Sequence, residues 1–319
     1  MSVIYKNTDF VLRMQVEQKA ENLAAKYSAY LDCLCAGLYA FQRDAIAQAI
    51  RFFVSAKYRD TEALARENHA RNLKLQMRFE RIGDYLDRFP LRRKKAVSLE
   101  LATGTGKSWV LYGIARIMLA EGLVDKVLVL CPSLTIEEGL KDKFNRFSGD
   151  AALQRILREL GAVYPNPGIK NANEPILAGD VCVENIHAVY ERTGSSIVDS
   201  FKGKGQRTLV LNDEAHHIFS EVDGATKKWM DFLLNEEFDF RYIANVTGTP
   251  YINDDYFLDV IYRFGLKQAL EMEPPIIKKI DYKIEEETQR DKGFAETWEN
   301  HRINREKYAG KLKPISIVI

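Results

Sequence analysis

The sequence predicts an α/β fold in three layers, with a mainly parallel sheet between two layers of helices. From Ala96 onward, short apolar runs alternate with stretches of helical length, which is typical of parallel strands joined by crossover helices. Glycine-rich and acidic motifs follow several of these runs. They would therefore lie at the carboxyl ends of the strands, where ligands of parallel sheets bind. The composition, 46% hydrophobic and 29% charged, is ordinary for a packed globular protein.

The N-terminal part is expected to be helical. Apolar residues recur at steps of three and four over residues 8–31, and Phe41–Tyr58 has a similar pattern. Residues 60–88 are strongly charged with sparse apolar positions, which predicts a long exposed helix or a helical hairpin.

From residue 96 the pattern predicts alternating elements. Strands are expected at 96–101, 126–131, 181–183, 208–212 and 242–246. Helices are expected at 107–120, 135–147, 151–160 and 227–234. Residues 164–178, rich in Pro and Asn, are expected to form a loop.

Charge gives no global indication of a nucleic-acid partner, because the net charge is +1. A local basic excess lies between Arg43 and Lys95, where fourteen Lys and Arg accompany seven Asp and Glu. A solvated helical face explains most of these side chains, and contact with duplex DNA or a partner subunit is the alternative.

Cysteine usage predicts reduced thiols. Cys33 and Cys35 form a pair too tight for the usual zinc spacing, and Cys131 and Cys182 fall in apolar, strand-like runs. No signal-peptide pattern or membrane-spanning run is present, so we expect a cytoplasmic protein.

A glycine-rich turn, Gly104–Ser108, joins a predicted strand to a predicted helix. It reads Gly-Thr-Gly-Lys-Ser, with Leu101 where the G-x-x-x-x-G-K-[ST] pattern has its first glycine. Its backbone N–H groups and the positive end of the helix would attract phosphate. Lys107 would reach the β- and γ-phosphates, and the Ser108 hydroxyl would bind Mg²⁺. An ordinary tight turn is the alternative.

Two carboxylates, Asp213 and Glu214, follow the apolar run Thr208–Asn212. We expect Asp213 to bind Mg²⁺ and Glu214 to orient and deprotonate the attacking water. The neighbouring His216 lies beside His217, but no third ligand follows at zinc spacing. A surface acidic turn would be credible alone, and the upstream phosphate loop disfavours it.

These segments resemble the motifs of superfamily 2 helicases. Ala102–Ser108 resembles motif I, Asp213–His216 reads D-E-A-H like motif II, and Thr247–Pro250 resembles motif III. The resemblance implies a RecA-like P-loop ATPase domain that uses ATP and Mg²⁺. Within the superfamily, the chain is most similar to the motor subunit of type III restriction enzymes, because Cys131–Ser133 followed by Glu138–Gly139 resembles that group's motif Ia.

The resemblance also implies roles for single residues. Gln42 would read the adenine, with an exposed polar residue on a helix as the alternative. The nucleotide would be held by Thr103, Gly104, Thr105, Gly106, Lys107 and Ser108. Contacts to a nucleic-acid backbone would come from Pro132, Ser133, Leu134, Asn185 and Ile186, where a plain turn at 132–134 is the alternative. Coupling of nucleotide state to domain movement would use His216, Thr247 and Thr249.

We expect three parts. These are an N-terminal helical segment (1–37), a first RecA-like domain (38–270) with a helical insertion at about 55–95, and a linker with the start of a second RecA-like domain (271–319). The rest of that second domain, which supplies arginine fingers in such motors, is missing from this chain. Residues 314–319 resemble its first strand, so we expect a piece of a longer protein.

The expected function is that of an ATP-driven motor acting on DNA, with RNA not excluded. The resemblance implies a restriction or phage-defence system, with a methyltransferase or another defence subunit as a further partner. A phosphotransferase and a nucleotide-gated scaffold are the competing classes, and the D-E-A-H and T-G-T-P segments favour the motor. This chain alone is expected to bind nucleotide and to hydrolyse it feebly.

Overall fold

The chain forms two compact units, Met1–Ile277 and Lys278–Ile319. The computed structural model describes residues 5–36, 39–187, 196–218, 224–276 and 290–307. The first unit holds the sheet and the motifs, and the second holds α14 (Arg290–Lys307). The expected strand at 314–319 lies outside the described residues.

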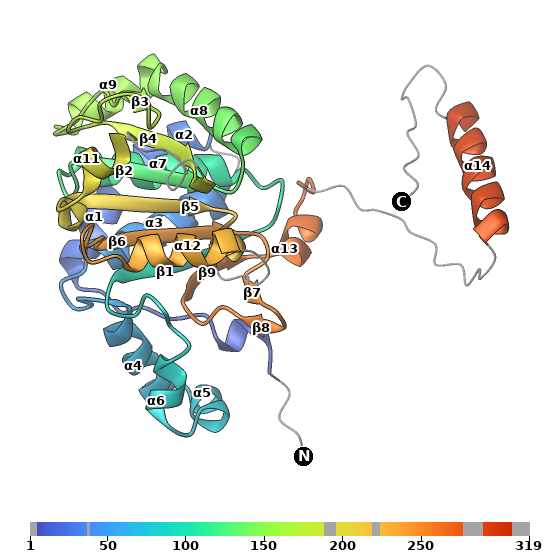
Figure 1. The fold of residues 1–319 in the computed structure, drawn as a ribbon, viewed down its shortest axis with the longest axis horizontal. Coiled ribbons are helices and arrows are strands. Elements are labelled where there is room, and N and C mark those ends of the chain that lie inside the picture. The colour runs from blue at the N-terminus through green and yellow to red at the C-terminus, as the bar shows by residue number, and fades with distance from the viewer. Residues whose placement is uncertain (1–4, 37–38, 188–195, 219–223, 277–289, 308–319) are drawn as a thin grey trace. The chain divides into compact units, whose positions relative to one another are not determined.

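Within the described residues, one seven-stranded sheet runs in the order β3-β4-β2-β5-β6-β1-β9, and every pairing is parallel (Figure 1). Its strands are β1 (Lys95–Leu101), β2 (Lys126–Cys131), β3 (Ile169–Lys170), β4 (Val181–Asn185), β5 (Thr208–Asp213), β6 (Tyr242–Thr247) and β9 (Val260–Phe264). A separate antiparallel hairpin consists of β7 (Tyr251–Ile252) and β8 (Asp255–Tyr256). The predicted fold class is confirmed.

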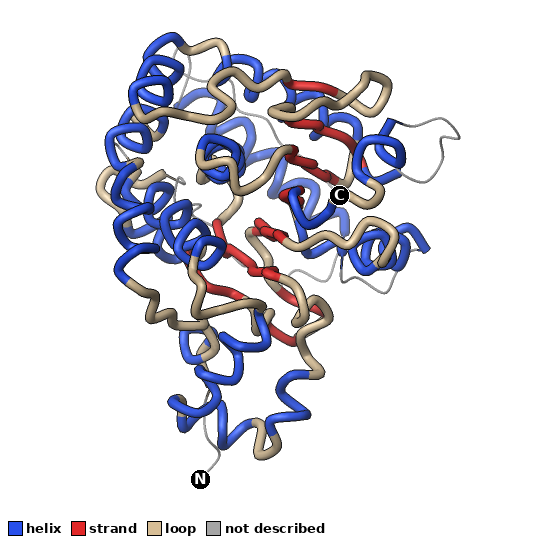
Figure 2. The backbone as a smooth tube through the Cα atoms, turned by 90° about the vertical axis from the view of Figure 1, so that its left-hand side faces the viewer, coloured by secondary structure: helices blue, strands red, loops and turns tan. Residues whose placement is uncertain are grey.

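Helices cover both faces of the sheet (Figure 2). One side carries α1 (Gln18–Lys26), α2 (Ser28–Leu34), α3 (Ala40–Val54), α7 (Lys107–Ala120), α8 (Leu134–Ser148) and α9 (Ala151–Glu159). The other carries α11 (Ser196–Phe201) and α12 (Gly224–Leu234). Alternate strand residues enter different cores, since Val127 and Val129 join the first and Leu128 and Leu130 the second.

The remaining described elements are short. They are three 3₁₀ turns, η1 (Asn7–Asp9), η2 (Gly205–Arg207) and η3 (Ala215–Ile218), and the helices α4 (Thr61–Arg71), α5 (Leu73–Arg78), α6 (Ile82–Leu86) and α13 (Leu266–Glu271). The strands and helices predicted between residues 96 and 246 are all present, with ends shifted by up to three residues. β9 and α13 were not predicted, and β3 lies in the expected loop.

The prediction of a helix over residues 8–31 is wrong for its first half. After η1 the chain is extended, and α1 begins only at Gln18. The backbone there is bound by distant partners: Leu12 N–H donates to the Val260 carbonyl at 2.8 Å, and Arg13 N–H donates to Asn68 Oδ1 at 2.7 Å. Tertiary hydrogen bonds therefore override the apolar periodicity.

The insertion is neither one long helix nor a simple hairpin. It consists of α4, α5 and α6, which lie together beside β1 (Figure 1). Asn72 separates the first two, because its side chain accepts hydrogen bonds from the N–H groups of Lys74 and Leu75 and so begins a new helix. Leu64, Tyr85 and other apolar residues of the insertion are buried, so the insertion has a core.

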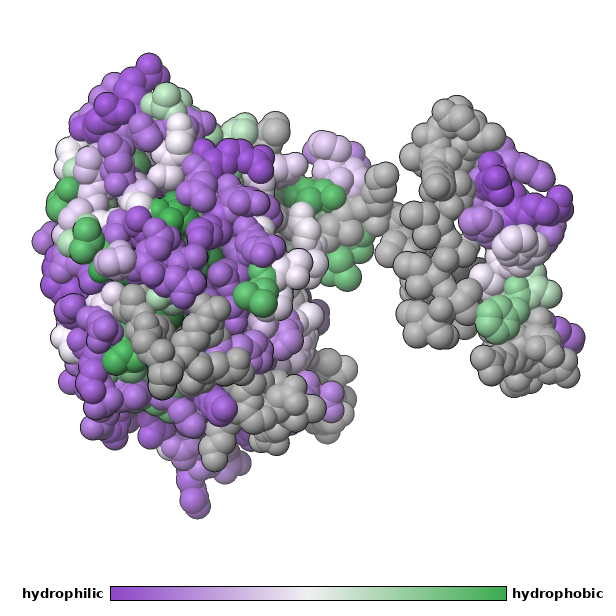
Figure 3. Space-filling view, turned by 45° about the horizontal axis from the view of Figure 1, so that its top comes forward, coloured by the Kyte–Doolittle hydropathy of each residue, from purple (hydrophilic) through white to green (hydrophobic). Residues whose placement is uncertain are grey.

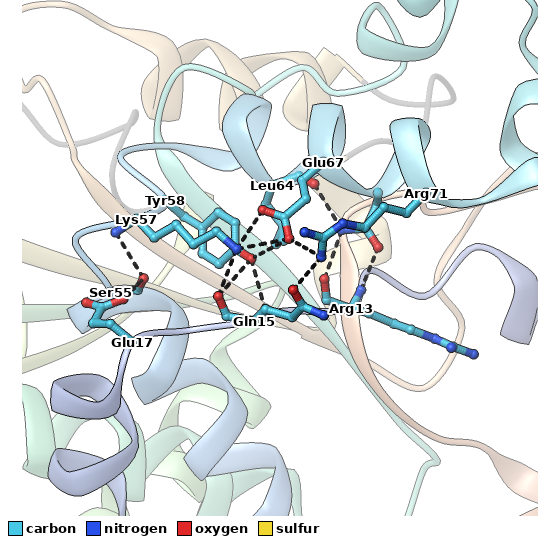
Figure 4. A network of polar contacts seen from close by, with 10 residues as sticks. Arg13, Gln15, Glu17, Ser55, Lys57, Tyr58, Leu64, Glu67 and Arg71 are labelled. Carbon is cyan, nitrogen blue, oxygen red and sulfur yellow. Dashed lines mark hydrogen bonds and ion pairs between the residues drawn. The ribbon is translucent and has the colours of Figure 1, made fainter.

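The N-terminal segment and the insertion are joined by a polar network, shown in Figure 4. Arg71 donates to the Gln15 side chain at 2.6 Å, and Lys57 donates to the Gln15 carbonyl at 2.9 Å. Glu67 accepts from both cations. A hollow of about 520 Å³ lies between these segments.

Most cations of the insertion that were counted as basic excess are ion-paired. The pairs are Lys57–Glu67, Arg59–Asp60, Arg66–Glu62, Arg71–Glu67, Lys74–Asp9, Arg78–Asp255, Arg88–Asp255 and Arg92–Asp87. This pairing favours the interpretation of a solvated, internally balanced face.

The surface of the first unit is largely hydrophilic on the face seen in Figure 3, with scattered apolar spots. Among the described residues, no helix combines the length and apolar character that crossing a bilayer requires. Cys131 and Cys182 are buried free thiols, as predicted, and burial raises the pKa of the Cys131 thiol to about 12. Of the other two thiols, Cys33 is exposed and Cys35 is buried.

The first testable prediction concerns Lys95, whose buried ammonium donates to the carbonyls of Phe52, Phe53 and Ser55 at 3.3, 3.0 and 2.6 Å. Lys95→Met leaves these carbonyls at the end of α3 without a donor, and we expect a loss of about 2–4 kcal/mol in the free energy of unfolding. Urea denaturation measures it.

The matched control is Arg93→Met, a change two residues away at an exposed position, for which we expect an effect within about 0.5 kcal/mol. Equal urea midpoints for Lys95→Met and the unchanged chain would contradict the role given to this lysine.

Candidate nucleotide site

The glycine-rich turn lies between the carboxyl end of β1 and the first turn of α7. Gly104 and Gly106 have φ angles of 85° and 83°, a conformation that costs glycine little and other residues more. The Thr105 hydroxyl donates to the Ala102 carbonyl at 2.6 Å, which closes the turn. The first N–H groups of α7 have no partner within the helix, so the turn and the helix end together form an anion-binding cradle.

The two predicted halves of the site meet. The Lys107 ammonium forms an ion pair with Glu214 Oε1, and its side chain is turned toward β5 rather than into the apolar core. Asp213, at the end of β5, is 6% exposed, and burial raises the pKa of its carboxyl to about 6. Its Oδ1 accepts the Glu214 N–H at 3.1 Å. One cation and two carboxylates therefore lie close together at the carboxyl ends of β1 and β5.

The oxygen atoms present suit a hard cation. Ser108 is buried on the first turn of α7, and Asp213 supplies a carboxylate. Among the described residues, no group of three or more His, Cys, Asp or Glu could hold a metal. A metal bound here would complete its coordination with phosphate oxygens and waters, which is how Mg²⁺ is usually bound.

The Thr247–Pro250 segment follows β6 and lies between the two halves. The ring Nδ1 of His216 and the Thr247 hydroxyl are 2.9 Å apart, and Thr249 N–H donates to the same hydroxyl at 3.1 Å. Gly248 packs closely against the phosphate loop, because a Cβ atom there would lie 3.0 Å from Thr103 N. The residues expected to couple the motifs are thus in contact with one another.

A pocket of about 240 Å³ adjoins the phosphate loop. It is lined by Cys35, Ala36, Tyr39, Gln42, Gly104, Thr105, Gly106, Trp109 and Ile276. Gln42 is only 3% exposed, and its Nε2 donates to the Thr105 carbonyl at 2.7 Å. The alternative of an exposed polar residue is therefore wrong for Gln42.

The sequence did not predict five residues that line this pocket, Cys35, Ala36, Tyr39, Trp109 and Ile276. Trp109 directly follows Lys107-Ser108, so an aromatic residue in the first helical turn was a local signal for it. Ile276 follows β9 and α13, and no local pattern indicates that this segment returns to the loop.

The segments expected to contact nucleic acid differ in exposure. Pro132 and Ser133 are half-buried and Leu134 is 61% exposed, while Asn185 and Ile186 are buried. The Ser133 hydroxyl accepts the Ile136 N–H at 3.4 Å and so caps α8. Because β2 and β4 are parallel neighbours in the sheet, the segments Pro132–Leu134 and Asn185–Ile186 both lie at its carboxyl end.

The second testable prediction uses the raised pKa of Asp213. Between its ordinary value and about 6, the native chain holds a proton that the unfolded chain releases, so stability falls as the pH rises through this window. Asp213→Asn removes that cost. We expect it to raise the free energy of unfolding at pH 7.5 by on the order of 1–3 kcal/mol, and the gain to vanish near pH 4.

Urea denaturation with a metal chelator present measures this gain at both pH values. Asp142→Asn, an exposed change on α8, serves as the control and should alter stability little at either pH. A gain that is the same at the two pH values would contradict burial of the Asp213 charge as its cause.

One of three comparisons with known proteins identifies a family for this chain. A family model described as "Type III restriction enzyme, res subunit" matches residues 38–252. No curated protein matches the chain. Among solved structures, the chain is similar to the UvsW helicase from bacteriophage T4, with 17% identity and a TM-score of 0.33, over 55% of this chain and only 56% of that one. On the family match, the chain belongs to the type III restriction enzyme res subunit family and contains a superfamily 2 helicase ATPase domain.

Proposed function

We propose that this chain is the nucleotide-binding half of an ATP-driven translocase that acts on DNA within a restriction or phage-defence system. The observation that carries the proposal is the ion pair between Lys107 and Glu214 beside Asp213, which puts the phosphate loop and the acidic pair at one site. The family description supports the system, since type III restriction is named in it.

Binding of ATP begins, in this proposal, with an exchange of partners. The backbone from Thr103 to Ser108 receives the phosphates, and Lys107 leaves Glu214 for their β- and γ-oxygens. A triphosphate carries more negative charge than one carboxylate, so it competes well for the ammonium. Ser108 and Asp213 would hold Mg²⁺, which neutralises charge on the phosphates when bound.

The exchange leaves Glu214 free for chemistry. Its carboxylate then orients the attacking water and accepts its proton, beside the γ-phosphate. His216, through its contact with the Thr247 hydroxyl, would pass the change at motif II to Thr249 and the following hairpin. Arginines from a second RecA-like domain would complete the site in the full motor.

Gln42 supports a preference for adenine. Because its Nε2 already donates to the Thr105 carbonyl, its Oε1 remains to accept a hydrogen bond from the base. Adenine offers an amino donor there, while guanine offers an oxygen that would face another acceptor. Trp109 and Tyr39 supply flat apolar surface in the same pocket.

The loop of Pro132, Ser133 and Leu134 would meet the nucleic-acid backbone, with Asn185 and Ile186 supporting it from β4. Contacts to phosphates carry no base-sequence information, which suits a protein that moves along a strand. The loop N–H groups and the start of α8 favour such an anion.

The third testable prediction concerns Lys107→Ala. Without the ammonium, the β- and γ-phosphates lose their only cation from the loop, and we expect Mg-ATP affinity to fall at least about a hundredfold. Isothermal titration calorimetry measures this affinity. Glu214→Gln should keep Mg-ATP binding while abolishing hydrolysis, which separates the two roles. An unchanged chain that binds neither Mg-ATP nor Mg-ADP would sink the proposal.

The fourth prediction tests the substrate. In the longest form of the protein available, duplex DNA should stimulate ATP hydrolysis at least about tenfold, and the stimulation should weaken as salt rises, because phosphate contacts release counterions. Stimulation by RNA alone would replace DNA with RNA in the proposal. Hydrolysis that no polynucleotide stimulates would contradict a translocase, and Lys107→Ala controls for contaminating activity.

A further inference from the structure

Glu137 joins the two segments that the proposed function assigns to nucleic acid. It lies on the first turn of α8, directly after Pro132–Leu134. Its Oε2 accepts two hydrogen bonds from Asn185, one from the backbone N–H at 3.0 Å and one from Nδ2 at 2.6 Å. The backbone and side-chain nitrogens of Asn185, at the end of β4, therefore both donate to Oε2 of Glu137 on α8.

A second carboxylate meets the same amide. Glu184, on β4, is 2% exposed, and its Oε1 accepts Asn185 Nδ2 at 3.1 Å while its Oε2 accepts Ala172 N–H at 2.8 Å. Burial and the Glu137 carboxylate together raise the pKa of Glu184. The raised pKa favours the protonated form of Glu184, and a proton on Glu184 would join it to the Glu137 carboxylate by a hydrogen bond.

The other charged groups near this pair come from two elements. Lys141 lies one turn further along α8, and Glu174 lies in the loop after β3, where it pairs with Lys170 at 3.1 Å. The thiols of Cys131 and Cys182 are close by and have raised pKa values. They are thus neutral at ordinary pH, and the acid pair dominates the local charge.

We propose that Glu137 is a positioning residue, which fixes the end of β4 to the start of α8 through Asn185 and thereby sets the surface that receives the nucleic-acid backbone. This inference rests on the proposed function in one respect, the contact of these segments with nucleic acid. Glu137 itself does not contact ATP or the backbone; it holds Asn185 and the Pro132–Leu134 loop at a fixed separation.

The test compares Glu137→Ala and Glu137→Gln in the full 319-residue chain. Fluorescence anisotropy with fluorescein-labelled oligothymidylate measures nucleic-acid affinity, and calorimetry measures Mg-ATP affinity. Glu137→Ala removes both hydrogen bonds and should weaken oligonucleotide binding about tenfold, with Mg-ATP affinity unchanged. Asp142→Ala, which removes an exposed charge from the same helix, should change neither affinity.

Glu137→Gln should restore the affinity to within about twofold, because its oxygen accepts both Asn185 donors and its amide donates to Glu184 where the proton was. A pH series adds a readout that a merely structural role would not move. In the unchanged chain the affinity should fall as the pH rises through the raised pKa of Glu184, when both carboxylates ionise and repel. Glu137→Gln should not show this fall.

Several outcomes overturn the inference. If Glu137→Ala binds oligothymidylate as the unchanged chain does, the positioning role of Glu137 is wrong and the proposed function stands. If Glu137→Gln is as weak as Glu137→Ala, charge rather than position explains the loss. If Glu137→Ala also loses Mg-ATP affinity, the residue acts on the fold at large. If the unchanged chain binds Mg-ATP but neither oligothymidylate nor duplex DNA, the proposed function and the inference fail together.

Discussion

The site depends on the parallel alignment of β5, β6 and β1, which brings three carboxyl ends together at one edge of the sheet. A buried chain of polar side chains fixes this alignment. Asn212 donates to Asn245 at 2.8 Å, Asn245 donates to the Ser98 hydroxyl at 3.4 Å, and Trp229 of α12 donates to Asn212 at 3.1 Å. In the strand register, Asn245 lies opposite Asn212 on one side and opposite Ser98 on the other. Since a shift by one residue would bury these polar groups unpaired, register and site geometry are set together.

The same alignment brings the motifs into contact with one another. In the register of β1 and β6, Thr247 lies opposite Glu100. Glu100 is four residues before Gly104 in the chain. The buried Glu100 carboxylate accepts hydrogen bonds from the Tyr256 hydroxyl at 2.6 Å and from Arg263 at 2.7 Å, so the strand that leads into the phosphate loop is tied to β8 and β9. The segment after Thr247 is therefore connected to the phosphate loop through a buried polar contact as well as through the sheet.

Local patterns predicted most strands of the sheet and the glycine-rich turn between β1 and α7 because their causes are local. The turn itself requires Gly104 and Gly106, because both have positive φ angles. Apolar runs of strand length indicate strands that are buried on both faces of a sheet. The failures have distant causes. The chain around Leu12 is extended because Val260, almost 250 residues away, accepts its N–H. Likewise Ile276 reaches the pocket beside Gln42 only through the fold of β9 and α13. No pattern in a short window contains those partners.

Charge at the site limits how a nucleotide can bind. Lys107 faces two carboxylates, Asp213 and Glu214, so these three side chains carry no excess positive charge to attract a triphosphate. The raised pKa of Asp213 expresses the same imbalance, since burial is opposed only in part by the Lys107 ammonium. Under the proposed function, a free triphosphate would add repulsion to that imbalance, while a triphosphate that carries Mg²⁺ brings the missing positive charge with it. The proposed function therefore implies that nucleotide affinity depends on the metal because of the residues of the site, and not only because of the chemistry of hydrolysis.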